Sequence, residues 1–447
     1  MAHKAIQHLA VIIILVALII ILYGKFFLNR NDNVFLLVYG TLVTLGIFIL
    51  FFISHRYVDP KEEIIKNKLN AGKKKPFVSC VVAVHNEEHL IERCIKSLLN
   101  SNYPNKEIII INDASTDKTS KVLLQFQANP LVTIIDLKRN VGKKKAIADG
   151  LKVAKGEFYV FTDSDSILEP TAISKIMEIF IHDEQIGAVS GHGRALNADK
   201  NTITRIQDSW YDGQFGIKKA FESVYGAVTC VSGPLAVFRK AAIFNYIPAW
   251  SNDTFLGKEF KFSTDRTLTS FALGGKYIGP KIKKKYHDSW FVQSQNYPDR
   301  EWKVIYCKSA KVWTNVPETF GKMLHQQIRW KKSFIRSIFL TGRFYWRKPL
   351  IAALRYYFTI LFVLTAPFIV FRQLIYQPWH GNYIAPILYI AGVLFIGSVY
   401  AIAYKLDNPR CHRWVYRPVM SIMSTMIFSW LVYYSLATIR KSIWRRG

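Results

Sequence analysis

The stretch FVSCVVAVHNEEHLIERCIKSLLNSNYPNKEIIIINDAS (77–115) decides the fold class. It opens with a nearly uninterrupted apolar run, which is typical of a strand buried on both faces. Apolar residues then recur at helical spacing behind a group of acidic residues, and a second buried run follows. The alternation predicts an α/β domain with a mainly parallel sheet and helices on both faces. Strands are expected at 77–84, 107–115, 132–137 and 157–165, and helices at 86–101, 116–128 and 142–156.

Carboxylates follow two of these expected strands. Asp113 ends the second strand, and Asp163 and Asp165 end the fourth in VFTDSDSILEP (160–170). Ligands of such sheets bind beyond the carboxyl ends of the strands. Two carboxylates this close repel unless a cation lies between them, and Mg²⁺ uses one or two carboxylates together with substrate phosphates. The pattern indicates a metal that holds a nucleoside diphosphate, and a solvated turn is the alternative.

Lysines gather near the end of the third strand, in NVGKKKAIADG (140–150). The segment lacks the GxxxxGK[ST] pattern of a P-loop. These lysines either approach an anionic substrate or form the solvated face of an amphipathic helix.

Three later segments could carry chemistry. VSGPLAVFRK (231–240) contains a Ser-Gly-Pro turn, for which a structural role is the ordinary interpretation. Asp265 and Arg266 begin a helix-like stretch, where the aspartate could also be an N-cap. In HQQIRWKKSF (325–334) the residues Gln326, Arg329 and Trp330 share one helix face, which is also compatible with a basic amphipathic helix on a membrane.

Long apolar runs flank the charged middle of the chain. Runs near 20 residues are long enough to cross a bilayer as helices. The first run could be a signal peptide, but it lacks a small-residue cleavage site and a second run follows at once, so a membrane span is expected instead. The five runs are 9–24, 34–53, 357–371, 383–404 and 418–439.

The net charge and the spacing of the cysteines further restrict the class of protein. The formal net charge is +29, and no nucleic-acid-binding module is recognisable. Anionic lipids at a cytoplasmic membrane face, together with phosphate-bearing substrates, fit the apolar runs better. The five cysteines form no CxxC pair, which indicates a reducing compartment rather than a disulfide framework or a zinc site.

The motifs resemble those of processive family-2 glycosyltransferases. DSD, TDR and QQIRW correspond in order to the DxD, (E/D)D and QxxRW motifs of that family. The resemblance covers about residues 75–275 and 310–447 and extends to hyaluronan synthases through five segments. Chito-oligosaccharide and chitin synthases are also similar, since they share NVGK(R/K)KA and the Asp-Arg-x-Leu-Thr pattern. The five segments are 191–223, 230–239, 252–269, 314–318 and 326–334.

The resemblance implies a role for each matched residue. Asp265 would be the general base, and Asp163 and Asp165 would bind the nucleotide and ligate Mg²⁺ or Mn²⁺. The remaining matches fall into three groups. Glu87, Asp113, Lys143 and Arg329 would bind the nucleotide-sugar, Cys230, Ser232, Gly233 and Pro234 would lie beside the acceptor, and Gln326, Trp330 and Trp444 would hold or gate the acceptor end.

The chain departs from the family in four places. DDG is replaced by NDA at 112–114, the acidic pair by Thr264 and Asp265, and the terminal WGTR by WRRG. The segment 279–305 resembles an insertion to which the sequence assigns no role.

The resemblance implies a GT-A type domain inserted between N-terminal and C-terminal membrane helices. Residues 1–54 would form two spans, 55–320 a cytoplasmic catalytic domain, 321–349 amphipathic interface helices and 350–447 a channel region with a basic tail. Three crossings after the catalytic domain would place the basic tail outside the cell, so one C-terminal segment should be re-entrant, interfacial or broken.

The expected activity is processive, inverting synthesis of a secreted β-linked polysaccharide at the plasma membrane. Hyaluronan from UDP-GlcA and UDP-GlcNAc is the expected product. The alternatives are an N-acetylglucosamine homopolymer and single addition to a lipid carrier; a decayed, non-catalytic scaffold is disfavoured by the retained acidic motifs. The expected partners are UDP-sugars, the nascent polysaccharide and membrane lipids, with neither nucleic acid nor an obligatory protein partner.

Overall fold

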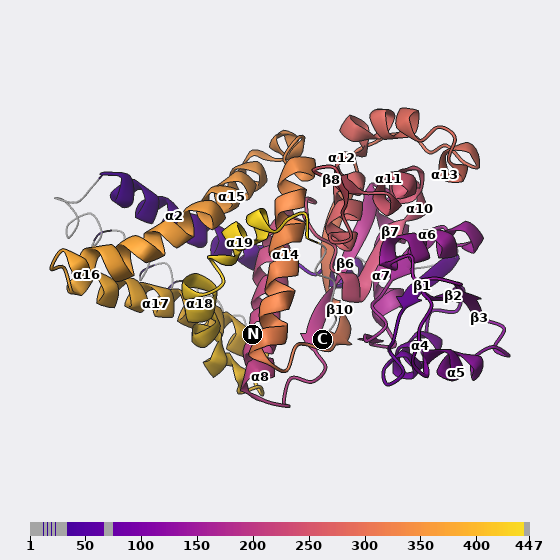
Figure 1. Ribbon diagram of the computed structural model, residues 1–447, viewed down its shortest axis with the longest axis horizontal. Helices are drawn as coiled ribbons and strands as arrows, with labels where there is room; N and C mark the ends of the chain where they lie inside the picture. Colours follow the sequence, from indigo (N-terminus) through magenta and orange to yellow (C-terminus); the bar gives the residue numbers. More distant parts are fainter. Residues whose placement is uncertain are drawn as a thin grey trace.

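The computed structural model describes residues 34–66 and 75–441, together with Ile12, Val16, Ile19 and Tyr23. Its centre is an eight-stranded sheet in the order β3-β2-β1-β4-β7-β6-β10-β5 (Figure 1). A separate hairpin is formed by β8 and β9. The sheet strands are β1 (Val78–Val84), β2 (Lys106–Asn112), β3 (Val132–Asp136), β4 (Phe158–Phe161), β5 (Ile167–Leu168), β6 (Ile186–Ala195), β7 (Ala236–Arg239) and β10 (Lys303–Thr314), and the hairpin strands are β8 (Thr254–Phe255) and β9 (Lys258–Glu259).

The sheet is mixed, and its parallel half is the part that the sequence predicts. β3, β2, β1 and β4 run parallel, as do β6 and β10. β7 pairs antiparallel with both β4 and β6, and β5 pairs antiparallel with β10. β7 therefore joins the two parallel groups into one sheet of the GT-A type.

Alternate residues of the central strands pack into two cores. Val81 and Ile109 face α6 on one side of the sheet, whereas Val82 and Ile110 face α4 and α7 on the other. The two-residue period of a strand sends neighbouring side chains to opposite faces, so these strands must be apolar throughout. The helices of the domain are α4 (Ile91–Leu99), α5 (Thr119–Leu124), α6 (Lys143–Val153), α7 (Ala172–His182), α8 (Thr202–Gly213), α9 (Ala220–Val224), α10 (Lys240–Ile243), α11 (Ile247–Ser251), α12 (Thr264–Lys285) and α13 (Trp290–Gln293).

The expected insertion 279–305 has a defined structure. It comprises the end of α12, the short α13 and the start of β10. Lys283 closes the segment by pairing with Asp299 at 3.0 Å.

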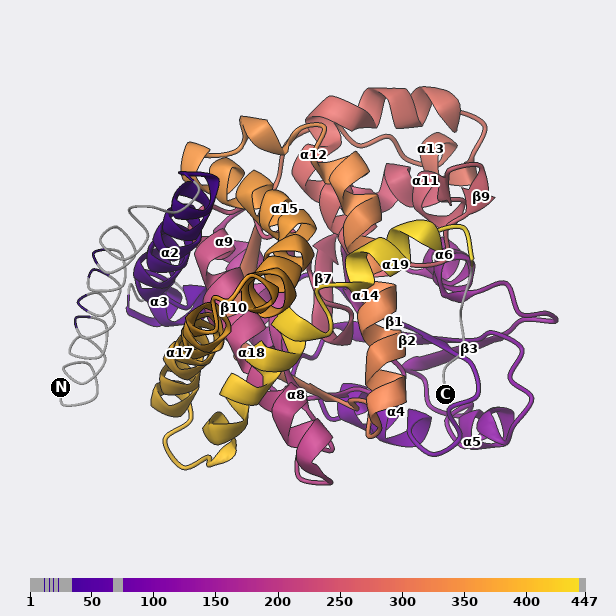
Figure 2. The same cartoon turned by 60° about the vertical axis from the view of Figure 1, so that its left-hand side comes forward.

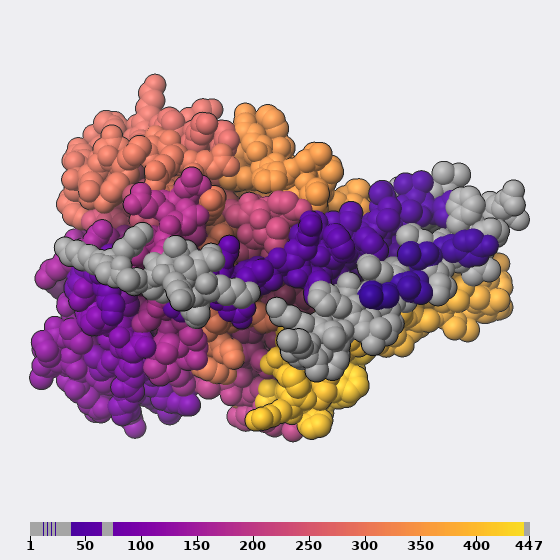
Figure 3. Space-filling model, turned by 180° about the vertical axis from the view of Figure 1, so that it is seen from behind, coloured from indigo at the N-terminus to yellow at the C-terminus, as the bar shows by residue number. Residues whose placement is uncertain are grey.

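A bundle of apolar helices extends from the domain on the side opposite β3 (Figure 1). Three described helices are long and apolar enough to span a membrane, namely Leu37–Ile64, Leu350–Trp379 and Ile384–Asp407. Figure 3 shows α2, in indigo, running along one face of the molecule from the domain outward along this bundle. These features indicate a membrane protein. The remaining helices are α2 (Val34–His55), α3 (Pro60–Lys66), α14 (Phe320–Thr341), α15 (Leu350–Phe371), α16 (Gln377–Trp379), α17 (Ile384–Asp407), α18 (Arg417–Met426) and α19 (Leu431–Ala437).

The last expected span is a broken pair of helices. α18 and α19 are bent by 46° at the break between them. α19 lies beside α14 (Figure 2), and the buried Lys332 of α14 donates hydrogen bonds to the carbonyls of Thr438 and Lys441 at 2.7 and 2.8 Å. The expected first span, 9–24, lies outside the continuously described residues.

Candidate active site

One cavity of about 2940 Å³ runs from the carboxyl ends of the sheet strands into the helical bundle. It collects side chains that are far apart in the sequence. Trp444 lies outside the described residues. The predicted site residues that line the cavity are Glu87, Asp113, Lys143, Asp163, Asp165, Cys230, Ser232, Gly233, Pro234, Asp265, Gln326, Arg329 and Trp330.

The DSD turn follows β4 and is held from three sides. Lys143, the first residue of α6, forms an ion pair with Asp163. The hydroxyl of Thr314, at the end of β10, donates a hydrogen bond to Asp165 Oδ1 at 3.1 Å. A Cβ on Gly233 would lie 3.1 Å from Asp163 Oδ2, so glycine permits the close approach of the Ser-Gly-Pro loop.

The donor set of this turn fits a hard divalent cation. Among the described residues no group of three or more His, Cys, Asp and Glu side chains is placed to hold a metal. Two carboxylates completed by substrate phosphates are the arrangement that Mg²⁺ or Mn²⁺ accepts. The cation would therefore bind with the nucleotide rather than in a site made by the protein alone.

Asp113 is almost fully buried and is bonded to the protein itself. It is 3% exposed, and its two carboxylate oxygens accept hydrogen bonds from the backbone N–H groups of Val141 and Gly142 at 2.7 and 2.9 Å. These bonds hold the loop that precedes α6 and so place Lys143 beside Asp163. Asp113 therefore orients the cationic side of the site.

One departure from the family pattern is alanine in place of glycine at position 114. Ala114 has a φ of 53°, in the left-handed region where a Cβ costs about 1–2 kcal/mol. The family's DDG places glycine, which carries no such penalty, at this position. The substitution changes the strain in the loop and leaves Asp113 in place.

Asp265 lies in the first turn of α12 beside the loop that contains Cys230. The Cys230 thiol donates a hydrogen bond to Asp265 Oδ2 at 3.4 Å. Burial, and then the charge of Asp265, raise the pKa of this thiol to about 12, so it remains a donor at neutral pH. Thr269 connects the same two segments, because its hydroxyl accepts from the Val231 N–H and donates to the Asp265 carbonyl at 2.9 and 2.7 Å.

A buried lysine supports the Ser-Gly-Pro loop. Lys219 Nζ donates to the hydroxyls of Ser232 and Ser190 at 2.5 and 2.7 Å and lies 4.2 Å from the ring centroid of Phe215. Burial lowers its pKa to about 8. The sequence analysis missed Lys219, because one lysine in a helical segment carries no recognisable signal.

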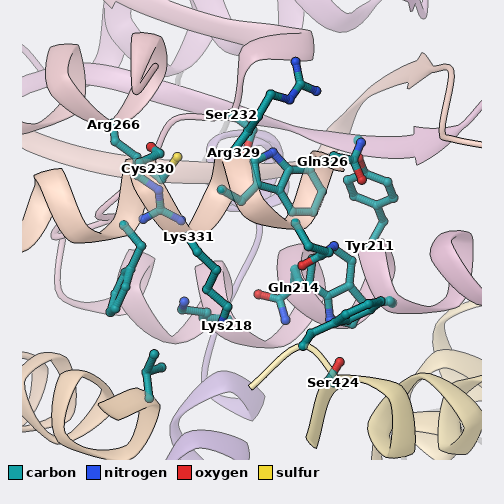
Figure 4. Close-up of a pocket in the computed structure, with 18 of the residues that line it drawn as sticks. Tyr211, Gln214, Lys218, Cys230, Ser232, Arg266, Gln326, Arg329, Lys331 and Ser424 are labelled. Carbon is teal, nitrogen blue, oxygen red and sulfur yellow. The ribbon is translucent and has the colours of Figure 1, made fainter. Parts of the chain in front are cut away.

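The three QxxRW residues lie on α14. Trp330 stacks on Trp210 with ring centroids 5.3 Å apart and meets Tyr211 edge-on at 6.1 Å. Burial and the carboxylates of Asp165 and Asp163 raise the pKa of Tyr211, whereas the charge of Arg329 opposes this shift. Figure 4 shows Gln326 close to Tyr211, and no hydrogen-bond partner for Gln326 Oε1 occurs in the described part of the chain.

The comparisons with known proteins define the enzyme class. Residues 79–245 match the family model described as glycosyl transferase family 2. The chain thus contains a family-2 glycosyltransferase domain, and the prediction that the protein is a glycosyltransferase is confirmed.

Its relatives include polysaccharide synthases. The chain is 26% identical to hyaluronan synthase from Streptococcus pyogenes over 379 residues, which cover 82% of each protein. It is 28% identical to poly-β-1,6-N-acetyl-D-glucosamine synthase from Staphylococcus epidermidis over 253 residues, 57% of this chain and 53% of that enzyme.

A solved structure confirms the fold. A mannosyltransferase from Pyrobaculum calidifontis, in complex with GDP-Man and Mn²⁺, matches with a TM-score of 0.57 and 17% identity. The match covers 92% of this chain and 99% of that structure. At this identity the likeness concerns the fold alone.

Proposed function

We propose that the protein is a membrane-embedded, processive, inverting glycosyltransferase that makes hyaluronan from UDP-GlcA and UDP-GlcNAc and secretes the chain across the membrane. One observation carries the proposal: a single cavity connects the DSD turn, Asp265 and Trp330 with α15, α17 and α18. A polymer that remains bound between additions needs such a continuous path. The similarity to hyaluronan synthase over 82% of the chain supports the choice of product.

The chemistry assigns a task to each part of the cavity. The UDP leaving group gains charge as its bond to the sugar breaks, and Lys143 and Arg329 would stabilise that charge. A metal held by Asp163 and Asp165 would add Lewis-acid stabilisation of the same diphosphate. Asp265 would take the proton from the acceptor hydroxyl as the new glycosidic bond forms.

The Cys230 thiol would keep the Asp265 carboxylate pointing into the cavity, because it donates to one of its oxygens. Direct attack opposite the leaving UDP converts an α-linked donor into a β-linked product. The scheme needs no glycosyl–enzyme intermediate, and the acceptor end would stack on Trp330.

The proposed domain plan keeps the expected boundaries. Residues 1–54 and 350–447 would lie in the membrane, 321–349 at its surface, and 55–320 in the cytoplasm beneath the plasma membrane. Accessibility of single engineered cysteines to a membrane-impermeant thiol reagent in intact cells tests this plan. Labelling within 55–320 before the cells are opened would contradict it.

The deciding experiment incubates purified protein with each UDP-sugar alone and then with both. We expect UDP release and long polymer only with both sugars, and a polymer that hyaluronidase degrades. An N-acetylglucosamine homopolymer is the second candidate, favoured by the similarity to poly-β-1,6-N-acetyl-D-glucosamine synthase. Polymer from UDP-GlcNAc alone that resists hyaluronidase would establish that candidate instead.

A further inference from the structure

Three cationic side chains from different elements line one part of the cavity. They are Lys218 in the π-helical turn between α8 and α9, Arg266 in α12 and Lys331 in α14. Figure 4 shows Lys218 and Lys331 pointing toward each other below Arg266. We call these three residues the cation cluster.

The cation cluster carries charge that the protein does not fully neutralise. Burial, and then the charges of Lys218 and Arg266, lower the pKa of Lys331 to about 8. Burial also lowers the pKa of Lys218. The charge of Glu222 raises this pKa, whereas the charges of Arg266 and Arg355 lower it further. Within the described ranges, none of the three cationic groups forms an ion pair or a side-chain hydrogen bond. Nearby acidic groups, among them Asp265 and Glu222, raise the pKa of Arg266, whereas part of the desolvation of Lys218 and Lys331 is uncompensated.

The nearby carboxylates are few, and both have other contacts. Glu222 accepts hydrogen bonds from the N–H and the hydroxyl of Thr229 at 3.0 and 2.8 Å. Asp265 accepts from the Cys230 thiol and from the Arg266 N–H. The cavity therefore keeps an excess of positive charge next to the proposed catalytic base.

The cation cluster is distinct from the nucleotide end of the cavity. Arg329, like Asp163 and Asp165, affects the pKa of Tyr211. The charged neighbours of Lys331 are instead Lys218 and Arg266. α14 thus carries one cation that interacts with Tyr211 and another that interacts with Lys218 and Arg266.

Positive charge continues from the cation cluster into the helical bundle. Arg355 of α15 and Arg417 of α18 line the same cavity. Arg417 is 6% exposed, its guanidinium lies 4.5 Å from the ring centroid of Tyr400, and its Nε has no hydrogen-bond partner in the described part of the protein. A buried charged side chain among apolar helices is costly, and it ordinarily marks a pathway for a charged or polar substrate.

The backbone that presents Lys218 is itself unusual. Residues Gln214–Lys219 form a π-helical turn within an otherwise continuous α8–α9 helix. Such turns are rare, and they occur frequently at functional sites. Here Gln214, Lys218 and Lys219 all line the cavity.

We propose that Lys218 and Lys331, with Arg266, bind the carboxylate of a uronic acid residue in the growing chain, just beyond the acceptor site. The inference rests on the proposed function and names the residues that would select an acidic polymer. Charge-assisted hydrogen bonds to a carboxylate are roughly twice as strong as neutral ones. A neutral chain would leave these partly buried cations unpaired, and that difference is the source of the selectivity.

The test measures binding of two tetrasaccharides to the purified full-length protein. One probe is a hyaluronan tetrasaccharide, and the other is the same molecule with its carboxyl groups reduced to alcohols. The variant is Lys218→Gln/Lys331→Gln, and the control is Lys276→Gln/Lys284→Gln, which removes two exposed lysines of α12 that do not line the cavity. UDP affinity is measured for every variant.

We expect the cavity variant to bind the hyaluronan tetrasaccharide at least about tenfold more weakly than wild type, since a hydrogen bond to a charged group contributes about 1.5–3 kcal/mol. Its affinity for the reduced probe and for UDP should not change, and the control should match wild type throughout. Lys218→Arg/Lys331→Arg should retain the preference for the acidic probe. Equal affinity of wild type for the two probes, or an equal loss for both, would overturn the inference.

Two outcomes separate this inference from the proposed function. If wild type makes hyaluronan but the cavity variant binds both probes as wild type does, the inference alone fails. A parallel fall in UDP affinity would assign the cation cluster to the nucleotide instead. If wild type makes only a neutral homopolymer and does not prefer the acidic probe, both fail.

Misfolding of the cavity variant is excluded by its thermal unfolding. Removing two partly buried cations that repel each other should leave the unfolding temperature equal to or above that of wild type. A lower unfolding temperature together with lost UDP binding would show that the two lysines are structural, which also overturns the inference.

Discussion

Asp253 connects the two halves of the proposed active site and provides the sharpest test of the architecture. Its carboxylate accepts hydrogen bonds from Lys144 of α6 at 3.1 Å and from two nitrogens of Arg336 of α14 at 2.8 and 3.2 Å. Lys144 directly follows Lys143, which pairs with Asp163. Arg336 lies on the helix that carries Trp330. The change Asp253→Asn removes the negative charge and nearly preserves the shape.

The expected loss of stability follows from burial. The side chains of Asp253 and Lys144 are 3% and 6% exposed, and that of Arg336 is 15% exposed. Removing one partner of a buried ion pair costs about 3–5 kcal/mol, because the other charge stays buried. The partial exposure of Arg336 favours the lower end, about 3 kcal/mol, which corresponds to roughly 5 °C in the unfolding temperature.

Thermal unfolding of the purified variant in detergent measures this loss. Asp288→Asn is the matched control, because the Asp288 side chain is 83% exposed and its removal should change the unfolding temperature by no more than about 1 °C. A triple variant with Lys144→Met, Asp253→Leu and Arg336→Met should lose less stability than Asp253→Asn alone, since no buried charge is left unpaired. If Asp253→Asn unfolds at the temperature of the control, the reasoning is refuted.

Four further changes test individual residues. Asp265→Asn should leave UDP–metal binding nearly intact and abolish transfer, and turnover within about tenfold of wild type would exclude Asp265 as the base. Trp330→Ala should reduce polymer formation more than donor hydrolysis, because stacking holds the acceptor and not the nucleotide; equal losses would indicate a structural role. Ala114→Gly should stabilise the protein by about 1 kcal/mol in denaturant or thermal unfolding, by relieving the positive φ of 53°. Burial raises the pKa of Asp212 to about 6, above the unfolded value of 3.8, so the stability that this carboxyl contributes is present below pH ~4 and lost as the pH rises through ~6. Asp212→Asn should therefore raise the free energy of unfolding by up to about 3 kcal/mol above pH ~7 and leave it unchanged near pH ~4, as measured by thermal unfolding at both pH values. A difference that does not vary with pH would contradict this cause.

Much of the sheet could be predicted because a buried strand is recognisable from its local sequence pattern. The runs that became β1, β2, β3 and β4 are apolar and bounded by turn residues, and that pattern is sufficient to identify buried strands. β7 could not be predicted in the same way, because it has only four residues and directly follows the Ser-Gly-Pro turn. Its antiparallel pairing with both β4 and β6 is a tertiary contact, so the sequence predicted a mainly parallel sheet but did not locate this antiparallel strand.

The C-terminal helices show a similar division. Hydropathy identified 418–439 as one apolar run, and the prediction that one C-terminal segment is re-entrant, interfacial or broken is consistent with the 46° bend between α18 and α19. The end of α19 is held by α14, whose Lys332 donates hydrogen bonds to the carbonyls of Thr438 and Lys441. A hydropathy pattern does not show that a helix will contact another segment about a hundred residues away along the chain.

The sequence by itself determined the strands of the parallel half, the acidic residues at their ends and the motif order that indicated a family-2 glycosyltransferase. Those features depend on residue type and short spacing, which side-chain periodicity and strand-end chemistry make readable. Only the tertiary structure decided that Asp113 supports the loop before α6, that Lys219 supports Ser232, and that Lys218 meets Lys331 across the cavity. Each of these contacts is between segments that are distant along the chain. The interactions of the charges are strong because the side chains are buried around a shared cavity, and local sequence does not encode that burial.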